Sequence, residues 1–153
     1  AHTLGNSMVL DTFAVSTHQG DALDSSQRDR LRETIFRVVT GEMPLGPEIE
    51  KRLKRRSQRI QVLDPDHAIV VNNRASDKFT LLEVSGPNRP GELYRITRAL
   101  GADGLAIHSA KISSYGQRYV DVFYLRDGLG GKIESTDRLA RVKTRVMESL
   151  SDG

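Results

Sequence analysis

A short loop rich in glycine and proline carries the groups best suited to chemistry in this chain. It reads Asn88-Arg89-Pro90-Gly91, after an apolar strand pattern over 79–84 and before a helix pattern. The first N–H groups of a helix lack partners within the helix and carry partial positive charge. A strand, a tight turn and a helix start therefore direct N–H groups at one point. Such a point suits a small anionic group, for instance the carboxylate of a free amino acid.

Two residues of this loop have properties that suit a ligand. Asn88 can present an amide to a carboxylate or to another amide. Gly91 permits close approach of the backbone. The structural alternative is a plain turn followed by a helix, with Pro90 at the first helical position.

The titratable side chains elsewhere form no pattern typical of catalysis or of a metal site. The histidines are scattered along the chain: His2, His18, His67 and His108. A lone histidine in a strand is usually structural or exposed. Because there is also no cysteine, we expect no metal site, and no cofactor in this chain. Asp11 and Asp121 could be taken for paired carboxylates, but their places in repeated strands favour a structural role, as hydrogen-bond acceptors at a sheet face.

Length and composition bound the chain to one or two small domains. Its 153 residues are 37% hydrophobic, which is enough for a core, and the formal net charge is +3. No apolar run is long enough to span a membrane, and no secretory signal pattern opens the chain, so we expect a cytoplasmic protein. Ala1–Leu4 reads as the middle of a strand, which predicts that the chain is part of a longer protein.

The densest run of positive charge is Lys51-Arg52-Leu53-Lys54-Arg55-Arg56. Such a run is usually a solvated helix face or a linker. Nucleic-acid binding is the alternative, since clustered lysine and arginine side chains supply phosphate contacts. No aromatic residues interleave for base stacking, and no recognition-helix motif accompanies the run, so we do not expect a nucleic-acid partner. Contact with an acidic surface of another domain is equally compatible.

The second half of the chain has the pattern of one α+β unit. We predict strands over 79–85, 105–114 and 118–126, and helices over 90–102 and 136–150. The last two strands form a hairpin around residues 115–117. This βαββα order lacks one strand of the ferredoxin-like split βαβ fold, an antiparallel sheet with helices on one face. Both faces of the strand over 119–125 are apolar, so one should meet the helices and the other a further domain or subunit.

An internal repeat predicts a second, partial unit at the start of the chain. The segment 9–15 matches 119–125, and an amphipathic helix follows each, capped near Ser25 or Ser26 in the first copy and near Ser135 or Thr136 in the second. The first copy has no room for the strand and helix that open the second. We therefore expect a partial unit over 1–40, a linker with a basic helix and short strands over 41–77, and a complete domain over 78–153. The short strands are expected at 59–63 and 68–72.

Together these segments resemble the ACT-domain family. The resemblance lies in Arg89-Pro90-Gly91 opening a helix, in the strands 107–112 and 120–124, and in the Gly-rich stretch 127–133. More narrowly, nearly the whole chain resembles the C-terminal tandem ACT region of the bacterial bifunctional PII uridylyltransferase/uridylyl-removing enzymes. The segments 8–13 and 73–77 fit the same region. The fold implied is a ferredoxin-like βαββαβ ACT domain preceded by a partial ACT unit.

The resemblance implies a regulatory glutamine sensor in nitrogen regulation. Enzymes of this kind uridylylate the signalling protein PII with UTP when glutamine is low, and remove the UMP when glutamine is high. They resemble Mg-dependent enzymes, but neither a nucleotidyl-transfer motif nor a His-Asp hydrolase pair occurs in this chain, so we expect the chain alone not to be an enzyme. Glu92 departs from the family, which more often has an apolar residue after Arg-Pro-Gly.

The implied ligand is L-glutamine, and its site would combine the loop with a strand of a neighbouring unit. The residues expected there are Asn88, Arg89, Pro90, Gly91, Ile107, His108 and Ser109. A neighbouring unit could come from a homodimer formed through the ACT sheets, which we favour, or from the partial unit docking within the same chain. The alternative function is a basic scaffold that binds a protein or nucleic acid without a small ligand.

Overall fold

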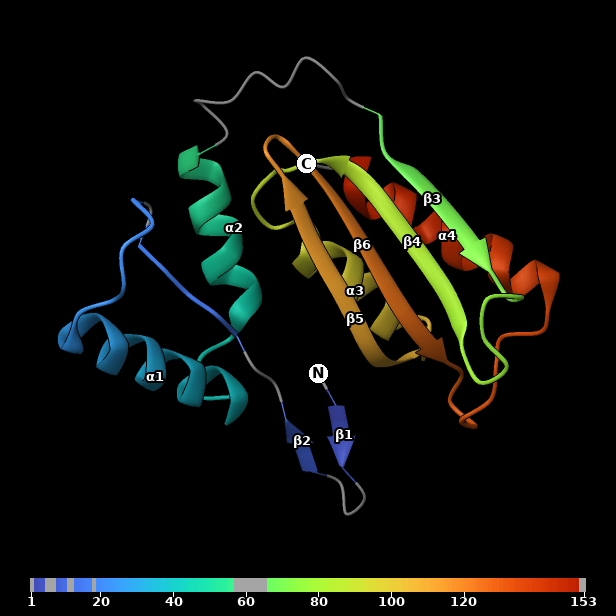
Figure 1. The fold of residues 1–153 in the computed structure, drawn as a ribbon, viewed down its shortest axis with the longest axis horizontal. Helices are drawn as coiled ribbons and strands as arrows, with labels where there is room; N and C mark the ends of the chain where they lie inside the picture. Colours follow the sequence, from blue (N-terminus) through green and yellow to red (C-terminus); the bar gives the residue numbers. More distant parts are fainter. Residues whose placement is uncertain (1, 5–7, 11–12, 18, 57–65, 152–153) are drawn as a thin grey trace. The chain divides into compact units, whose positions relative to one another are not determined.

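The computed structural model describes residues 2–4, 8–10, 13–17, 19–56 and 66–151. Residues 11–60 belong to one compact unit and the rest of the chain to another. Figure 1 shows the elements of both units along the sequence. Within the described part of the chain, no helix combines the length and the apolar character needed to cross a membrane.

A four-stranded antiparallel sheet with two helices on one face makes up the larger unit (Figure 1). The strands lie side by side in the order β3-β4-β6-β5. The strands are β3 (Ala68–Asn72), β4 (Thr80–Pro87), β5 (Ala106–Tyr115) and β6 (Arg118–Arg126). The helices are α3 (Glu92–Ala102) and α4 (Thr136–Ser151). This arrangement confirms the predicted α+β, ferredoxin-like class, and the predicted bounds hold to within about two residues.

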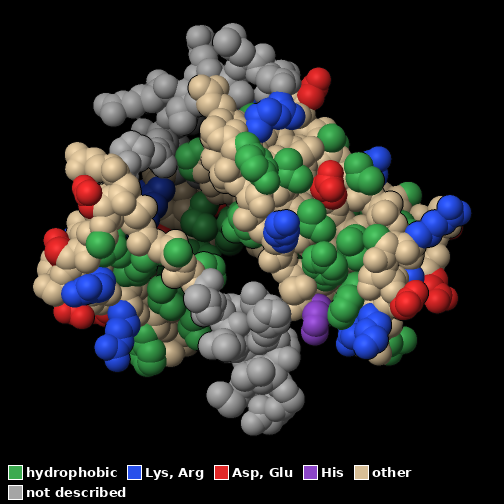
Figure 2. Space-filling view, viewed as in Figure 1, with side chains coloured by type: hydrophobic (Ala, Val, Ile, Leu, Met, Phe, Trp, Pro, Cys, Tyr) green, Lys and Arg blue, Asp and Glu red, His purple; other side chains and the backbone are tan. Residues whose placement is uncertain are grey.

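Side chains of β6 alternate between the core and the open face of the sheet, because successive residues of a strand point to opposite sides. Tyr119, Phe123 and Leu125 are buried, whereas Val122 and Tyr124 are half-buried. The core beneath the helices is built from apolar side chains of the sheet and both helices, including Leu82, Val84, Ile96, Leu100, Val142, Val146 and Leu150. Figure 2 shows patches of hydrophobic side chains on the open face, with single charged side chains between them.

β3, which precedes β4 in the sequence, is the edge strand that pairs with β4. Ala68 pairs with Ser85 and Asn72 with Leu81, antiparallel. Ile69 belongs to the core, and α4 lies alongside β3. The fourth strand that the βαββα pattern lacks is therefore supplied from the segment between the two repeats.

The smaller unit contains two helices, α1 (Ser25–Val39) and α2 (Leu45–Arg56). Asp24 caps α1: its side chain accepts a hydrogen bond from the N–H of Gln27, and its own N–H donates to the side-chain oxygen of Gln27. The N-cap is therefore Asp24, the residue directly before the predicted position near Ser25 or Ser26, because this reciprocal capping box satisfies two backbone donors at once. None of the α1 residues is buried.

The start of the chain differs from the predicted strand over 9–15. Strand β1 (His2–Leu4) pairs antiparallel with β2 (Met8–Leu10). Residues 13–17 have no regular secondary structure, whereas Asp11 and Thr12 lie outside the described residues. The strand expected at 59–63 lies outside them as well, and the one at 68–72 is confirmed as β3.

Candidate functional site

The loop between β4 and α3 is tied to the neighbouring hairpin by its backbone. The N–H of Asn88 donates to the carbonyl of Gln117 at 2.6 Å, and the N–H of Arg89 donates to the carbonyl of Pro87 at 2.9 Å. Asn88 is exposed, while Arg89 and Pro90 are half-buried. The loop is therefore anchored at its base and presents the Asn88 side chain to solvent.

Gly91 sets the start of the helix. Its φ of 88° is left-handed, which favours glycine, and α3 begins at the next residue. Pro90 is therefore not the first helical residue. This differs from the structural alternative, in which Pro90 opened the helix after a plain turn. Gly91 provides no side-chain cap. The first N–H groups of α3 thus meet no capping side chain, which is the feature expected of an anion-binding helix start.

The strand residues predicted to close the site have three different surroundings. Ile107 packs against the core. The register of β5 against β6 shifts between Ile107 and Ser109, so His108 lies at a β-bulge. The ring of His108 stacks on Phe79 with centroids 4.5 Å apart. Ser109 is half-buried and pairs with Tyr124. His108 is therefore held by an aromatic contact.

Within one unit, the loop and this strand segment lie at opposite ends of the sheet. Pro87 pairs with Arg118, whereas Ile107 pairs with Leu125. These two pairs lie seven residue steps apart along β6, or about 23 Å at about 3.3 Å per residue. The structure brings Asn88, Arg89, Pro90 and Gly91 together, and separately Ile107, His108 and Ser109. A site that uses both groups requires a second unit.

Beside the loop, but inside the core, lies a group of buried polar side chains. The carboxylate of Glu92 is 3.0 Å from Nε2 of His67, and these side chains are only 3% and 5% exposed. The ring of Tyr119 lies 6.3 Å from that of His67. The second carboxylate oxygen of Glu92 and the hydroxyl of Tyr119 have no hydrogen-bond partner among the described residues.

This burial shifts the proton equilibria of two neighbouring groups. Burial raises the pKa of Tyr119 above its usual value, and the negative charges of Glu92 and Asp121 raise it further. Burial also raises the pKa of Asp121; the hydrogen bond from the N–H of Ser113 acts in the opposite direction, and the charge of Glu92 adds to the rise. Asp121 accepts that hydrogen bond at 3.2 Å, as its predicted structural role requires.

Comparison with known proteins relates the chain to a group of bacterial enzymes. A bifunctional uridylyltransferase/uridylyl-removing enzyme from Gluconobacter oxydans is 39% identical over 152 residues. Proteins of the same name from Rhodospirillum rubrum and Azospirillum brasilense are 37% and 36% identical. The matches to these three cover 97–98% of this chain. The chain is related to one region of these enzymes. It spans only 16% of their length. No family model and no solved structure matches it.

The residues that sequence reasoning missed in this uridylyltransferase-related chain are His67, Glu92 and Tyr119. In α3, Glu92, Ile96 and Leu100 follow one another at intervals of four residues, so they lie on one face, which is buried. Leu93, which lies one position after Glu92 and off this face, is 43% exposed. The signal available in the sequence was the charged Glu92, at a position where the resemblance to ACT domains led us to expect an apolar residue.

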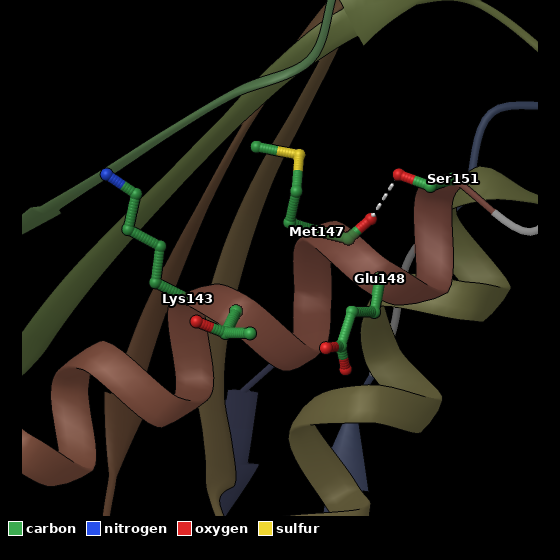
Figure 3. A pocket seen from close by; sticks show the side chains of 5 residues that line it. Lys143, Met147, Glu148 and Ser151 are labelled. Atoms are coloured by element: carbon green, nitrogen blue, oxygen red, sulfur yellow. Dashed lines mark hydrogen bonds between the residues drawn. The ribbon is translucent and has the colours of Figure 1, made fainter.

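One surface hollow of the uridylyltransferase-related chain lies away from the loop. It has a volume of about 560 Å³ and is lined by five residues of α4 (Figure 3). Lys143, Met147, Glu148 and Ser151 border it, and the Ser151 hydroxyl donates to the carbonyl of Met147 at 3.0 Å. Its described lining comes from one helix and contains none of the predicted site residues.

The basic run 51–56 and the histidine and carboxylate side chains form no further site among the described residues. Lys51 and Arg52 are exposed on α2, and the side chains of 53–56 lie outside the description. Within the described ranges, no three histidine, aspartate or glutamate side chains gather in a metal-binding arrangement. Of the candidate groups, the loop 88–91 is thus the one whose geometry suits a ligand.

Proposed function

We propose that residues 68–151 form a regulatory ACT-type unit that binds L-glutamine. The observation that carries this proposal is the start of α3, which follows the left-handed Gly91 with no side-chain cap. Helix starts of this kind favour anions through their N–H groups and the helix dipole. The resemblance to the ACT region of uridylyltransferase/uridylyl-removing enzymes suggests the class of ligand, a free amino acid.

The groups of the loop match the parts of a free amino acid. The ligand α-carboxylate would lie against the first N–H groups of α3, with the positive charge of Arg89 close in sequence. The exposed amide of Asn88 could exchange two hydrogen bonds with the side-chain amide of glutamine. Glutamate offers only acceptor oxygens when ionised, so it would lose one of these bonds and bind less well.

We propose that a second copy of the unit completes the site. The loop and the segment 107–109 lie at opposite ends of one sheet, so a second unit is needed to bring them together. β5 is an edge strand, and exposed edges recruit other strands. Light scattering at micromolar protein tests this part of the proposal. A dimer is expected, and a clean monomer in both this chain and a version extended at its N-terminus would refute it.

We further propose that the whole protein transfers uridylyl groups to PII and removes them, and that this region regulates those activities without taking part in the chemistry. The carboxylates of Glu92 and Asp121 are buried in the core, where a substrate does not reach them, and this is consistent with a region that takes no part in the chemistry. The chain alone should neither add UMP to PII nor remove it. Turnover by a preparation free of contaminating enzymes would overturn this assignment.

Thermal unfolding with added amino acids tests ligand binding directly. At 100 times its dissociation constant, L-glutamine should stabilise the chain by about 2.7 kcal/mol. The melting temperature would rise by roughly 5–10 °C. L-glutamate should give a smaller rise, and Asn88→Ala should abolish the response. Gln117→Ala is the matched control, since it removes a nearby exposed amide and keeps the backbone carbonyl that anchors Asn88.

Failure of this test has a defined meaning. No shift and no heat of binding with millimolar glutamine would refute the proposed site. A shift with a polyanion such as heparin, in the absence of any amino-acid response, would instead support the basic scaffold function.

A further inference from the structure

Strand β3 is attached to the rest of its unit at both ends. At its C-terminal end, the side-chain amide of Asn73 donates to the carbonyl of Ile133 at 2.8 Å. Lys132 donates to the carbonyls of Asn73 and Ser76. At its N-terminal end, the preceding residue His67 is bonded to Glu92. Only the second attachment reaches α3, the helix that directly follows the loop 88–91.

His67 reaches Glu92 by crossing over β4. Ala68 pairs with Ser85 and Gly86 pairs with Tyr119, so His67, Gly86 and Tyr119 follow one another across three strands. A Cβ atom at Gly86 would come within 2.3 Å of Cδ2 of His67. The imidazole therefore occupies the space that a side chain on β4 would otherwise fill.

Glu92 connects this contact to the loop without any intervening residue. It follows Gly91 directly and is the first residue of α3. Among the described residues, His67 is the partner within hydrogen-bond distance of its carboxylate, and Tyr119 is the other polar side chain beside it. A buried carboxylate that loses a partner is costly, so its position is tied to that of His67. A shift of the loop backbone would be transmitted to the Glu92 side chain and from there to His67.

We propose that Glu92 and His67 are positioning residues that couple the state of the loop 88–91 to the docking of β3. This coupling rests on the proposed function. When glutamine occupies the loop 88–91, the contact between Glu92 and His67 stabilises the docking of β3 in the sheet. β3 continues from the segment between the two repeats, so its docking sets where that segment is anchored. By linkage, a docked β3 favours the ligand-competent loop to the same extent.

A double-mutant cycle on the full 153-residue chain, without ligand, tests the coupling. Gly91→Ala strains the loop, and His67→Phe removes the imidazole while keeping a ring. Hydrogen exchange of amides 68–72 reports docking of β3. We expect Gly91→Ala to speed this exchange about fivefold or more when His67 is present. In the His67→Phe background it should change by less than about twofold.

Three controls separate coupling from general destabilisation. Exchange of β6 amides monitors whether each variant remains folded. Asn73→Ala loosens the far attachment of β3 and should leave the effect of Gly91→Ala intact. His67→Gln keeps a side-chain donor and should restore part of the coupling. If His67→Phe does not fold, Glu92→Met replaces it. An equal effect of Gly91→Ala in both backgrounds, or no effect at 68–72 in the parent, would overturn the proposal.

A ligand arm distinguishes this proposal from the proposed function. Glutamine should slow exchange at 68–72 in the parent chain, whereas the His67→Phe variant should bind glutamine by calorimetry without slowing that exchange. Absence of glutamine binding in the parent would contradict the proposed function alone, and the cycle without ligand would still decide the coupling.

Discussion

Nε2 of His67 lies 3.0 Å from the carboxylate of Glu92 within the core, although 25 positions separate the two residues in the sequence. The contact joins the residue before the edge strand β3 to the first residue of α3. Polar pairs buried this deeply are uncommon unless they are bonded to one another. The pair therefore fixes how the segment between the repeats attaches to the ferredoxin-like unit.

The stability of the chain should fall in alkaline solution because of Tyr119. The folded state raises the pKa of this residue above its ordinary value of 10. Between pH 10 and the folded pKa the native state holds the proton and the unfolded state releases it, so stability decreases as pH rises. Tyr119→Phe should remove this part of the pH dependence in urea unfolding between pH 8 and 11 and change stability near neutrality by no more than about 1 kcal/mol.

The exposed Tyr115 provides the matched control for this measurement. Tyr115→Phe removes the same hydroxyl from a side chain that is 68% exposed. It should leave the alkaline pH dependence unchanged. A steep decline that persists in Tyr119→Phe would show that other groups cause it.

A second pH effect should come from Asp121 in acid. Burial raises its folded pKa above the ordinary 3.8. Its contribution to stability is full below pH 3.8. Between pH 3.8 and the folded pKa, the native state holds a proton that the unfolded state has released, so this contribution is lost as pH rises through the folded pKa. Asp121→Asn should flatten this window while keeping an acceptor for the N–H of Ser113. Coincident pH profiles for the parent and the variant would contradict the prediction.

Two glycines of the same region should respond oppositely to alanine. Gly91 has a left-handed φ of 88°, so Gly91→Ala should destabilise the unit by about 1–2 kcal/mol. Gly101 lies inside α3 with open space around its Cα, so Gly101→Ala should stabilise by about 0.5–1 kcal/mol. Denaturant midpoints of the two variants measure both effects. A neutral or stabilising Gly91→Ala would show that the turn at Gly91 is not fixed as the structure has it, and a destabilising Gly101→Ala would contradict the open space around Gly101.

Phe123 should be the largest single contributor among the aromatic core side chains. It is fully buried beneath both helices. Phe123→Ala removes a buried ring and leaves a cavity, which typically costs about 3–5 kcal/mol. Leu129→Ala is the control, since Leu129 is 97% exposed and should change stability by less than about 0.5 kcal/mol. Urea unfolding followed by circular dichroism would compare them.

Local patterns in the sequence predict the elements of the larger unit well, because alternation and helical spacing are local signals. The bounds of β6 and the hairpin turn at Gly116 follow from such signals, and so does the start of α4 after Ser135. The pairing of β3 with β4 does not follow from these signals, although only residues 73–79 lie between the two strands. The contact between His67 and Glu92 is hidden because 25 positions separate the two residues, so His67 stands in the sequence as one of several scattered histidines.

For the candidate site, the sequence predicts the loop but not the separation of its two parts. Gly91 and Pro90 mark the turn because few other residues adopt its backbone angles. The segment 107–109 follows α3, which carries the chain back along the sheet by about 16 Å at 1.5 Å per residue. The start of β5 therefore lies at the end of the sheet opposite the loop, a consequence of helix length that residue types alone do not reveal.

The place of β3 in the sequence also bears on the order in which the unit folds. A strand at the end of the unit would have to find β4 after the intervening helices and strands had been made. β3 instead forms a hairpin with β4 across the short connection 73–79. Closing a short loop costs less entropy, and local contacts form faster. We expect this edge of the sheet to form early, so that His67 is already in place when α3 packs and brings Glu92 to it.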